Sequence, residues 1–101
     1  MKSNLIENGQ QRTYMLSEGF SFADNTLFRT IIDEISSSDC SGVDLDMRGV
    51  TSIDSAGLGM LMLAFEAASK AQIPFRIMRP QGQVNKLLEV SDFAKIMRIE
   101  S

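Results

Sequence analysis

The sequence predicts a mixed α/β domain whose sheet is mainly parallel, with an N-terminal hairpin and helices packed on the sheet. Two short apolar segments flank a turn-forming pair at the start of the chain, and segments with helical periodicity then alternate with strand-like ones. Alternation of strand and helix favours parallel pairing, with crossover helices covering the sheet. A chain of 101 residues fits one domain, so we expect a single unit over residues 1–101.

The opening hairpin is predicted from residues 5–6 and 12–16, which look like strands on either side of Asn8 and Gly9. Asparagine followed by glycine tolerates the positive φ angles that a tight hairpin turn needs. The hairpin should add an antiparallel pair at one side of the sheet.

The first helix is predicted over residues 23–36, because its apolar residues recur at intervals that place them on one face. They are Leu27, Phe28, Ile31, Ile32 and Ile35. Either Asp24 or Asn25 can cap the start of this helix, since both side chains accept hydrogen bonds from free backbone N–H groups. The serine-rich run that begins at residue 36 ends it.

The next strand is predicted over residues 43–48, where apolar and charged side chains alternate. One side carries Val43, Leu45 and Met47, and the other carries Asp44, Asp46 and Arg48. We expect the charged side to face solvent or a helix. Residues 49–54 are then predicted to form a connecting loop.

The second helix is predicted to run from Ser55 or Ala56 to about residue 71. Its inward face should consist of Leu58, Leu61, Met62, Phe65 and Ala68. Further apolar side chains lie away from that face, and we expect some of them to stay partly exposed and to form a partner contact beside Ser55. These are Met60, Leu63, Ala64 and Ala67.

Three shorter elements complete the predicted order β-β-α-β-α-β-α-β. Residues 73–77 form a strand, residues 84–88 mark a short third helix, and residues 95–100 form a last short strand.

Composition argues against several functions. The net charge of −3 argues against direct binding of nucleic acid. The absence of histidine removes Ser-His-Asp and Cys-His catalysis and the usual zinc sites. Cys40 has no second cysteine to pair with, and no segment reaches the roughly 20 apolar residues of a membrane span. We therefore expect a cytoplasmic, non-enzymatic binding protein that does not insert into membranes and that uses no metal and no cofactor.

The acidic residues suggest two other functions, an enzyme and a receiver domain. Asp44, Asp46 and Asp54 could form an acid/base or magnesium set, but no phosphate-binding loop or activated nucleophile accompanies them. A receiver domain also has a phosphorylatable acid at the end of a strand. The acidic pair that follows the first strand of receiver domains is missing here.

The most informative stretch is residues 46–59, DMRGVTSIDSAGLG, where a serine-bearing turn opens directly into a helix. Ser55 lies at or next to the N-cap, where free N–H groups and the positive end of the helix dipole favour an anion. Gly57 and Gly59 are expected to keep the surface low, so that another protein could approach the hydroxyl. From the residues alone two roles stay open: a helix cap supplied by Asp54 or Ser55, or a modifiable serine.

This stretch, followed by an apolar helix, resembles the STAS domain of the bacterial anti-sigma factor antagonists. Residues 74–77 and 83–91 also look like that family's fourth strand and third helix, so the resemblance covers roughly residues 12–100. It implies a STAS-like fold and a role in transcription regulation.

The resemblance further implies control by partner switching. In that family a serine kinase, which is also an anti-sigma factor, phosphorylates the serine of this turn. The unmodified form binds the kinase or anti-sigma factor and so frees a sigma factor, and a phosphatase resets the system. By position Ser55 matches the phosphorylated serine, while either Asp24 or Ser21 matches an acidic position before the first helix. The implied partner-binding residues are Asp24, Asp54, Ser55, Ala56, Gly57, Leu58 and Met60.

The same resemblance implies one alternative function. STAS domains also serve as accessory subunits of lipid transporters or of sensory complexes, where they bind protein without sigma-factor control.

Overall fold

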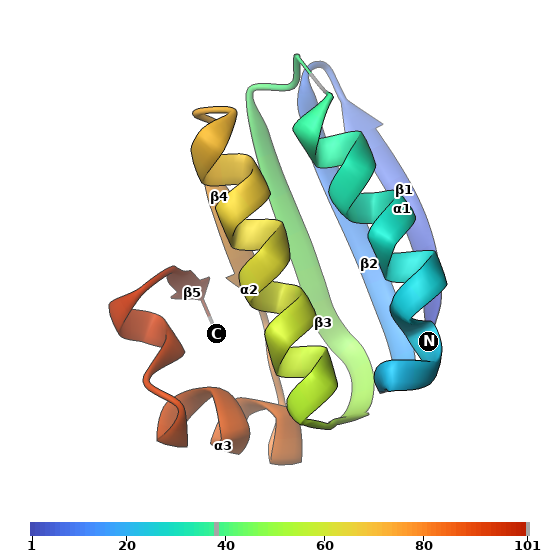
Figure 1. The fold of residues 1–101 in the computed structure, drawn as a ribbon, viewed down its shortest axis with the longest axis vertical. Helices are drawn as coiled ribbons and strands as arrows, with labels where there is room; N and C mark the ends of the chain where they lie inside the picture. The colour runs from blue at the N-terminus through green and yellow to red at the C-terminus, as the bar shows by residue number, and fades with distance from the viewer. Residues whose placement is uncertain (38, 101) are drawn as a thin grey trace.

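The computed structural model describes residues 1–37 and 39–100, which form a five-stranded sheet with helices packed against it (Figure 1). The strands lie in sequence order across the sheet; β1 is antiparallel to β2 and the other neighbours are parallel. The strands are β1 (Lys2–Asn8), β2 (Gln11–Phe20), β3 (Gly42–Ile53), β4 (Phe75–Met78) and β5 (Arg98–Glu100). The helices are α1 (Asn25–Ser36), α2 (Ser55–Lys70) and α3 (Gly82–Val90), with 3₁₀ turns η1 (Phe22–Asp24) and η2 (Phe93–Lys95). This confirms the predicted fold class.

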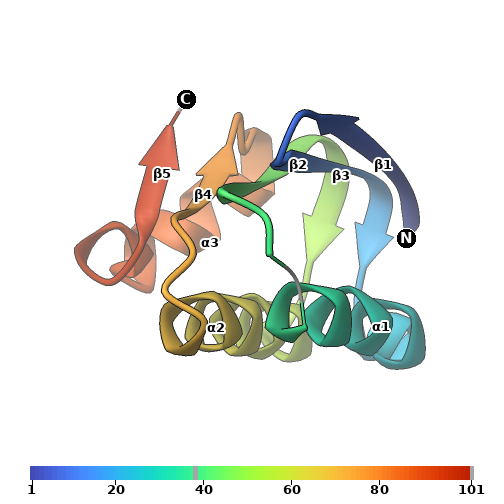
Figure 2. The same cartoon turned by 90° about the horizontal axis from the view of Figure 1, so that it is seen from above.

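Helices α1 and α2 lie side by side on one face of the sheet, while α3 lies at the end of the sheet where α2 begins (Figures 1 and 2). The core fills the space between the sheet and these helices, and Phe28, Leu45, Leu61 and Ile77 are among its fully buried side chains. Among the described helices none is both long enough and apolar enough to cross a bilayer.

The hairpin forms one residue later than the sequence suggested. Asn8 pairs with Gln11, so the two loop residues are Gly9 and Gln10 rather than Asn8 and Gly9. Gly9 has a φ of 65°, which glycine adopts without steric cost.

Strand β3 is longer than predicted, because residues 49–53 continue the strand instead of forming a loop. They pair with the second half of β2, where the register shifts twice and Glu18 takes a φ of 68°. A bulge places an extra residue in one strand and bends it, so the two strands can stay paired although their register has shifted. As a result β3 ends at Ile53, directly before Asp54 and helix α2.

We expected the charged side of β3 to face solvent or a helix. It lies instead on the sheet face opposite α1 and α2, where Arg48 is exposed but both aspartates are buried. Asp44 and Asp46 are only 6% and 8% exposed. Arg76 of β4 binds both oxygens of Asp44, with its Nε at 2.8 Å and its Nη2 at 2.6 Å, and also binds Glu100 of β5. Asp46 accepts a hydrogen bond from the backbone N–H of Arg48 at 3.0 Å. The Asp44 carboxylate therefore links β3 to β4, whereas Asp46 is held within its own strand, and both buried carboxylates have hydrogen-bond partners.

The buried face of α2 is rotated relative to the prediction. It consists of Gly57, Met60, Leu61, Ala64 and Ala68. Leu58, Met62 and Phe65, which we expected to be fully inward, are only partly buried. The rotation follows from packing. Helix α2 contacts α1 as well as the sheet, so part of its apolar surface faces α1 and not the strands.

Candidate functional site at the start of helix α2

Helix α2 begins with an aspartate cap. Asp54 has an extended backbone, and its Oδ1 accepts a hydrogen bond from the N–H of Gly57 at 2.8 Å. This is the N-cap geometry that satisfies one of the free donors in the first helical turn. Of the two candidate caps in the sequence, the structure therefore selects Asp54.

Ser55 is the first residue of α2 and is exposed. Within residues 1–37 and 39–100 its hydroxyl makes no hydrogen bond, because the cap is already supplied by its neighbour. The hydroxyl therefore lies at the positive end of the α2 dipole with a free oxygen. A group of this kind is accessible to a modifying enzyme and compatible with an added anion.

The turn before α1 lies beside this cap, although the two are more than 30 residues apart in sequence. The backbone N–H of Phe22 donates to Oδ2 of Asp54 at 3.3 Å, and the N–H of Asp54 donates to the carbonyl of Phe20 at 3.3 Å. The side chain of Phe22 is 69% exposed, which is the highest value among the exposed large apolar side chains; the next is Val90 at 68%. The structure thus places Phe22, whose side chain is exposed, next to the start of α2.

A family model for the STAS domain matches residues 4–101. The chain belongs to the STAS domain family.

Known relatives agree with this assignment. A STAS-domain containing protein of Pseudomonas aeruginosa is 27% identical over 92 residues, which are 91% of this chain and 90% of that protein. A Thermotoga maritima structure described as an anti-sigma factor antagonist superposes with a TM-score of 0.89 at 20% identity, covering 98% of this chain and 86% of that one. The phosphorylated form of SpoIIAA, a Bacillus cell fate determinant, gives a TM-score of 0.76 at 13% identity, covering 99% and 92% of the two chains. At these identities the two structures establish the shared fold.

The two candidates for the acidic position before α1 have different roles in this STAS domain. Ser21 caps η1: its Oγ accepts a hydrogen bond from the N–H of Ala23, and Asp24 in turn accepts one from the N–H of Ser21 at 2.9 Å. The other oxygen of Asp24 lies 2.8 Å from the amino group of Met1. Burial alone would raise the pKa of Asp24, but the hydrogen bonds from Met1 and Ser21 outweigh it and lower that pKa. Both oxygens of Asp24 are therefore already engaged within the chain.

Two of the predicted partner-binding residues are buried instead of displayed. Gly57 faces the sheet, where an added Cβ would lie 2.6 Å from Ile53 Cγ1 and 2.9 Å from the Phe20 carbonyl oxygen. Its small size therefore lets α2 approach the strands and does not lower the outer surface. Met60 is only 6% exposed, which corrects the expectation that its side chain is available beside Ser55.

The remaining predicted residues form a continuous surface with the first turn of α2. Asp54 and Ser55 are exposed, while Ala56 and Leu58 are partly buried. Gly59 is exposed, and nothing lies within 4 Å of the position that a Cβ would take there. The accessible site therefore consists of this turn and the neighbouring Phe22.

Two residues of the site were missed from the sequence. Phe22 could have been found from the spacing of Ser21 and Asp24, because serine followed three residues later by an acid is a capping-box pattern that fixes a turn. Gln83 of α3 gave no such signal. Its side-chain amide accepts from the N–H of Ile53 at 3.1 Å and donates to the carbonyl of Ile53 at 3.2 Å, which fixes the end of β3 next to Asp54.

The groups that this site exposes are suited to binding another molecule. In the described part of the chain no three histidine, cysteine, aspartate or glutamate side chains gather where they could hold a metal ion. The site is an exposed helix start with one free hydroxyl, one capping carboxylate and one exposed ring. Such a surface can contact a protein and can carry a phosphate.

Proposed function

We propose that this STAS domain is an anti-sigma factor antagonist controlled by phosphorylation of Ser55. In this proposal the unmodified form binds an anti-sigma factor or serine kinase and so releases a sigma factor, and a serine phosphatase restores the unmodified form. The observation that carries the proposal is the division of roles at the start of α2. Asp54 makes the capping hydrogen bond, so the exposed hydroxyl of Ser55 is not needed to cap the helix and can be modified.

The likeness to anti-sigma factor antagonists supports the same reading. One of the similar structures is SpoIIAA in its phosphorylated form, so this fold can accommodate a phosphorylated state. The proposed contact surface consists of the exposed Phe22, Asp54 and Ser55 and the partly buried Ala56 and Leu58.

A phosphate on Ser55 should weaken partner binding far more than it weakens the fold. Phosphoserine carries about −1.5 to −2 charges at neutral pH. The helix dipole stabilises an anion there by roughly 0.3–2 kcal/mol, while a charge on Asp54 about 5 Å away costs only about 0.8 kcal/mol in water. These terms nearly cancel in the free protein.

The balance changes once a partner covers the turn. At an effective dielectric constant of about 20 the same charge pair costs about 3 kcal/mol, and the phosphate also loses hydration. A loss of about 1.4 kcal/mol is tenfold in affinity. Binding should therefore fail while the free domain stays folded.

The test is affinity capture from the source bacterium with wild type, Ser55→Ala, Ser55→Asp and the control Thr51→Asp. Thr51 is also exposed and lies close to the site in sequence, but it is outside the helix. We expect wild type, Ser55→Ala and Thr51→Asp to capture the same kinase or anti-sigma factor, and Ser55→Asp to lose it. Equal capture by Ser55→Asp, with circular dichroism showing a folded protein, would contradict the proposal. Capture of a transporter subunit by all four proteins would instead favour the accessory-subunit function.

A further inference from the structure

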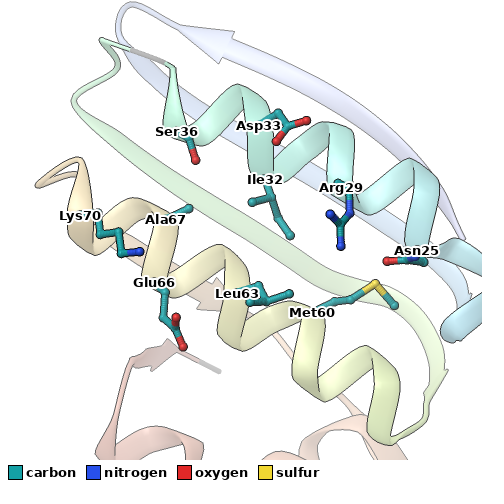
Figure 3. Close-up of a pocket in the computed structure, with 10 residues that line it drawn as sticks. All are labelled: Asn25, Arg29, Ile32, Asp33, Ser36, Met60, Leu63, Glu66, Ala67 and Lys70. Carbon is teal, nitrogen blue, oxygen red and sulfur yellow. The ribbon is translucent and has the colours of Figure 1, made fainter.

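A groove runs between α1 and α2 (Figure 3), and Ser55 does not line it. Its volume is about 300 Å³. Apolar atoms of Ile32, Leu63 and Ala67 line it, with the buried Met60 at one end. Leu63 is 47% exposed, so the groove presents an uncovered apolar strip.

Four charged side chains also line this groove. Arg29 and Asp33 come from α1, and Glu66 and Lys70 come from α2. Within the described residues none of these four forms an ion pair closer than 4 Å with any other group. All four charges are therefore available to a binding partner.

The order of these charges is self-complementary. Both helices run in the same direction (Figure 1), and along that direction the sign goes from positive to negative on α1 and from negative to positive on α2. The members of each pair are four residues apart, which puts them about 6 Å apart on one side of the helix. The groove has no net charge, so it does not favour a strongly acidic or basic partner.

We propose that the α1–α2 groove is the self-association surface of this protein, and that its occupant is a second copy of the same chain. A copy turned by 180° about an axis perpendicular to the helices lays α1 antiparallel on the copy's α1. Arg29 then faces the copy's Asp33, and this contact occurs twice because of the symmetry. Glu66 and Lys70 lie further along the helices (Figure 3), so they do not face each other across the same axis. The apolar strips centred on Leu63 meet beside the two Arg29–Asp33 contacts.

The size of the surface sets the expected strength. Helix α2 has 16 residues, so the two helices present a face of roughly 24 by 20 Å. This is below the area of a standard stable interface, and it corresponds to a weak, reversible dimer. The charged pairs contribute mainly to orientation, because exposed ion pairs add little net affinity.

Sedimentation velocity over a wide concentration range tests the proposal with the untagged protein alone. We expect a reversible monomer–dimer equilibrium for wild type and at least tenfold weaker association for Leu63→Glu, because the dimer would bury an unpaired charge. Arg29→Asp should weaken association as well, since it places acids opposite each other. The double variant Arg29→Asp/Asp33→Arg should recover it, because the reversed α1 pair is again complementary to itself.

The control is Val90→Glu, an equally drastic change at a 68% exposed residue of α3 that lies off the groove. It should leave the dimerisation constant unchanged. A wild-type protein that stays monomeric at all concentrations would overturn the proposal. So would a double variant as weak as Arg29→Asp, or a Val90→Glu defect as large as that of Leu63→Glu. Circular dichroism of each variant separates loss of association from loss of folding.

Discussion

Helices α1 and α2 begin with the same two residue types, a serine and an aspartate, yet the two starts are chemically different. Before α1, Ser21 precedes Asp24 by three residues, and each side chain accepts a hydrogen bond from the other's turn. Before α2, Asp54 precedes Ser55 directly, so the aspartate takes the cap and the serine becomes the first helical residue. The order and spacing of the pair therefore decide whether a serine is used for structure or left free.

The difference also affects how firmly each start is held. The α1 start is closed by its reciprocal bonds and by the contact between Asp24 and the amino group of Met1. The α2 start is held mainly by backbone and side-chain groups around Ser55, namely Phe22, Gly57 and Gln83. A modification of Ser55 should therefore leave the surrounding structure intact.

The largest expected effect comes from the packing that holds the α2 start. Gly57→Ala should destabilise the protein by about 1–3 kcal/mol, because the new methyl group would overlap the backbone oxygen of Phe20 and the side chain of Ile53. Gly59→Ala is the matched control in the same helix. It meets open space and should stabilise the helix by up to about 1 kcal/mol. Urea unfolding measures both, and two shifts of the same sign would show that Gly57 does not govern the approach of α2 to the sheet.

A smaller effect should appear at the α1 start, and it should depend on pH. The pKa of Asp24 is lowered in the folded protein, so its contribution is complete above the unfolded pKa of about 4 and disappears as the pH falls through the folded value. Asp24→Asn should therefore be less stable than wild type at neutral pH, and the gap should close in acid. Unfolding curves between about pH 2 and pH 7 test this. A gap that stays constant down to the lowest pH would mean that the carboxylate charge is unimportant there.

The smallest effect should separate the two serines. Ser21→Ala removes the side-chain cap of the 3₁₀ turn η1, which leads into α1, and should cost about 1 kcal/mol. Ser55→Ala removes a hydroxyl that makes no hydrogen bond in the described part of the chain, and it should change stability by less than about 0.5 kcal/mol. Thermal or urea unfolding of the two variants side by side gives the comparison. Equal losses would assign Ser55 a structural role that this geometry does not give it.

Much of the fold could be predicted from periodicity, because each element has a clear apolar pattern. The five strands, three helices and the antiparallel hairpin were all expected, and Ser55 was correctly placed at the start of the second helix. The extension of β3 through residues 49–53 was not expected. It depends on bulges in β2, and a bulge changes the pairing of a distant segment without a signature in that segment.

The face of α2 shows a second limit. Helix α2 is apolar on several sides, so the sequence alone could not show which side would turn toward α1, and Met60 was expected to be exposed although it is buried. The burial of Asp44 was missed for a related reason, because its partner Arg76 lies on another strand. Both errors concern contacts between elements, which local patterns do not encode.

The contact between Gln83 and Ile53 has a consequence for how any protein can reach this end of the molecule. Strand β4 pairs with β3 only over residues 43–46, which leaves the later part of that edge without a neighbouring strand. At Ile53 the amide of Gln83 takes up both the N–H and the carbonyl, as one residue of a sixth strand would. An incoming peptide therefore finds these backbone groups already used and cannot extend the sheet at Ile53. The partner contact that we propose beside Ser55 would then depend on side chains, so single substitutions should change its specificity.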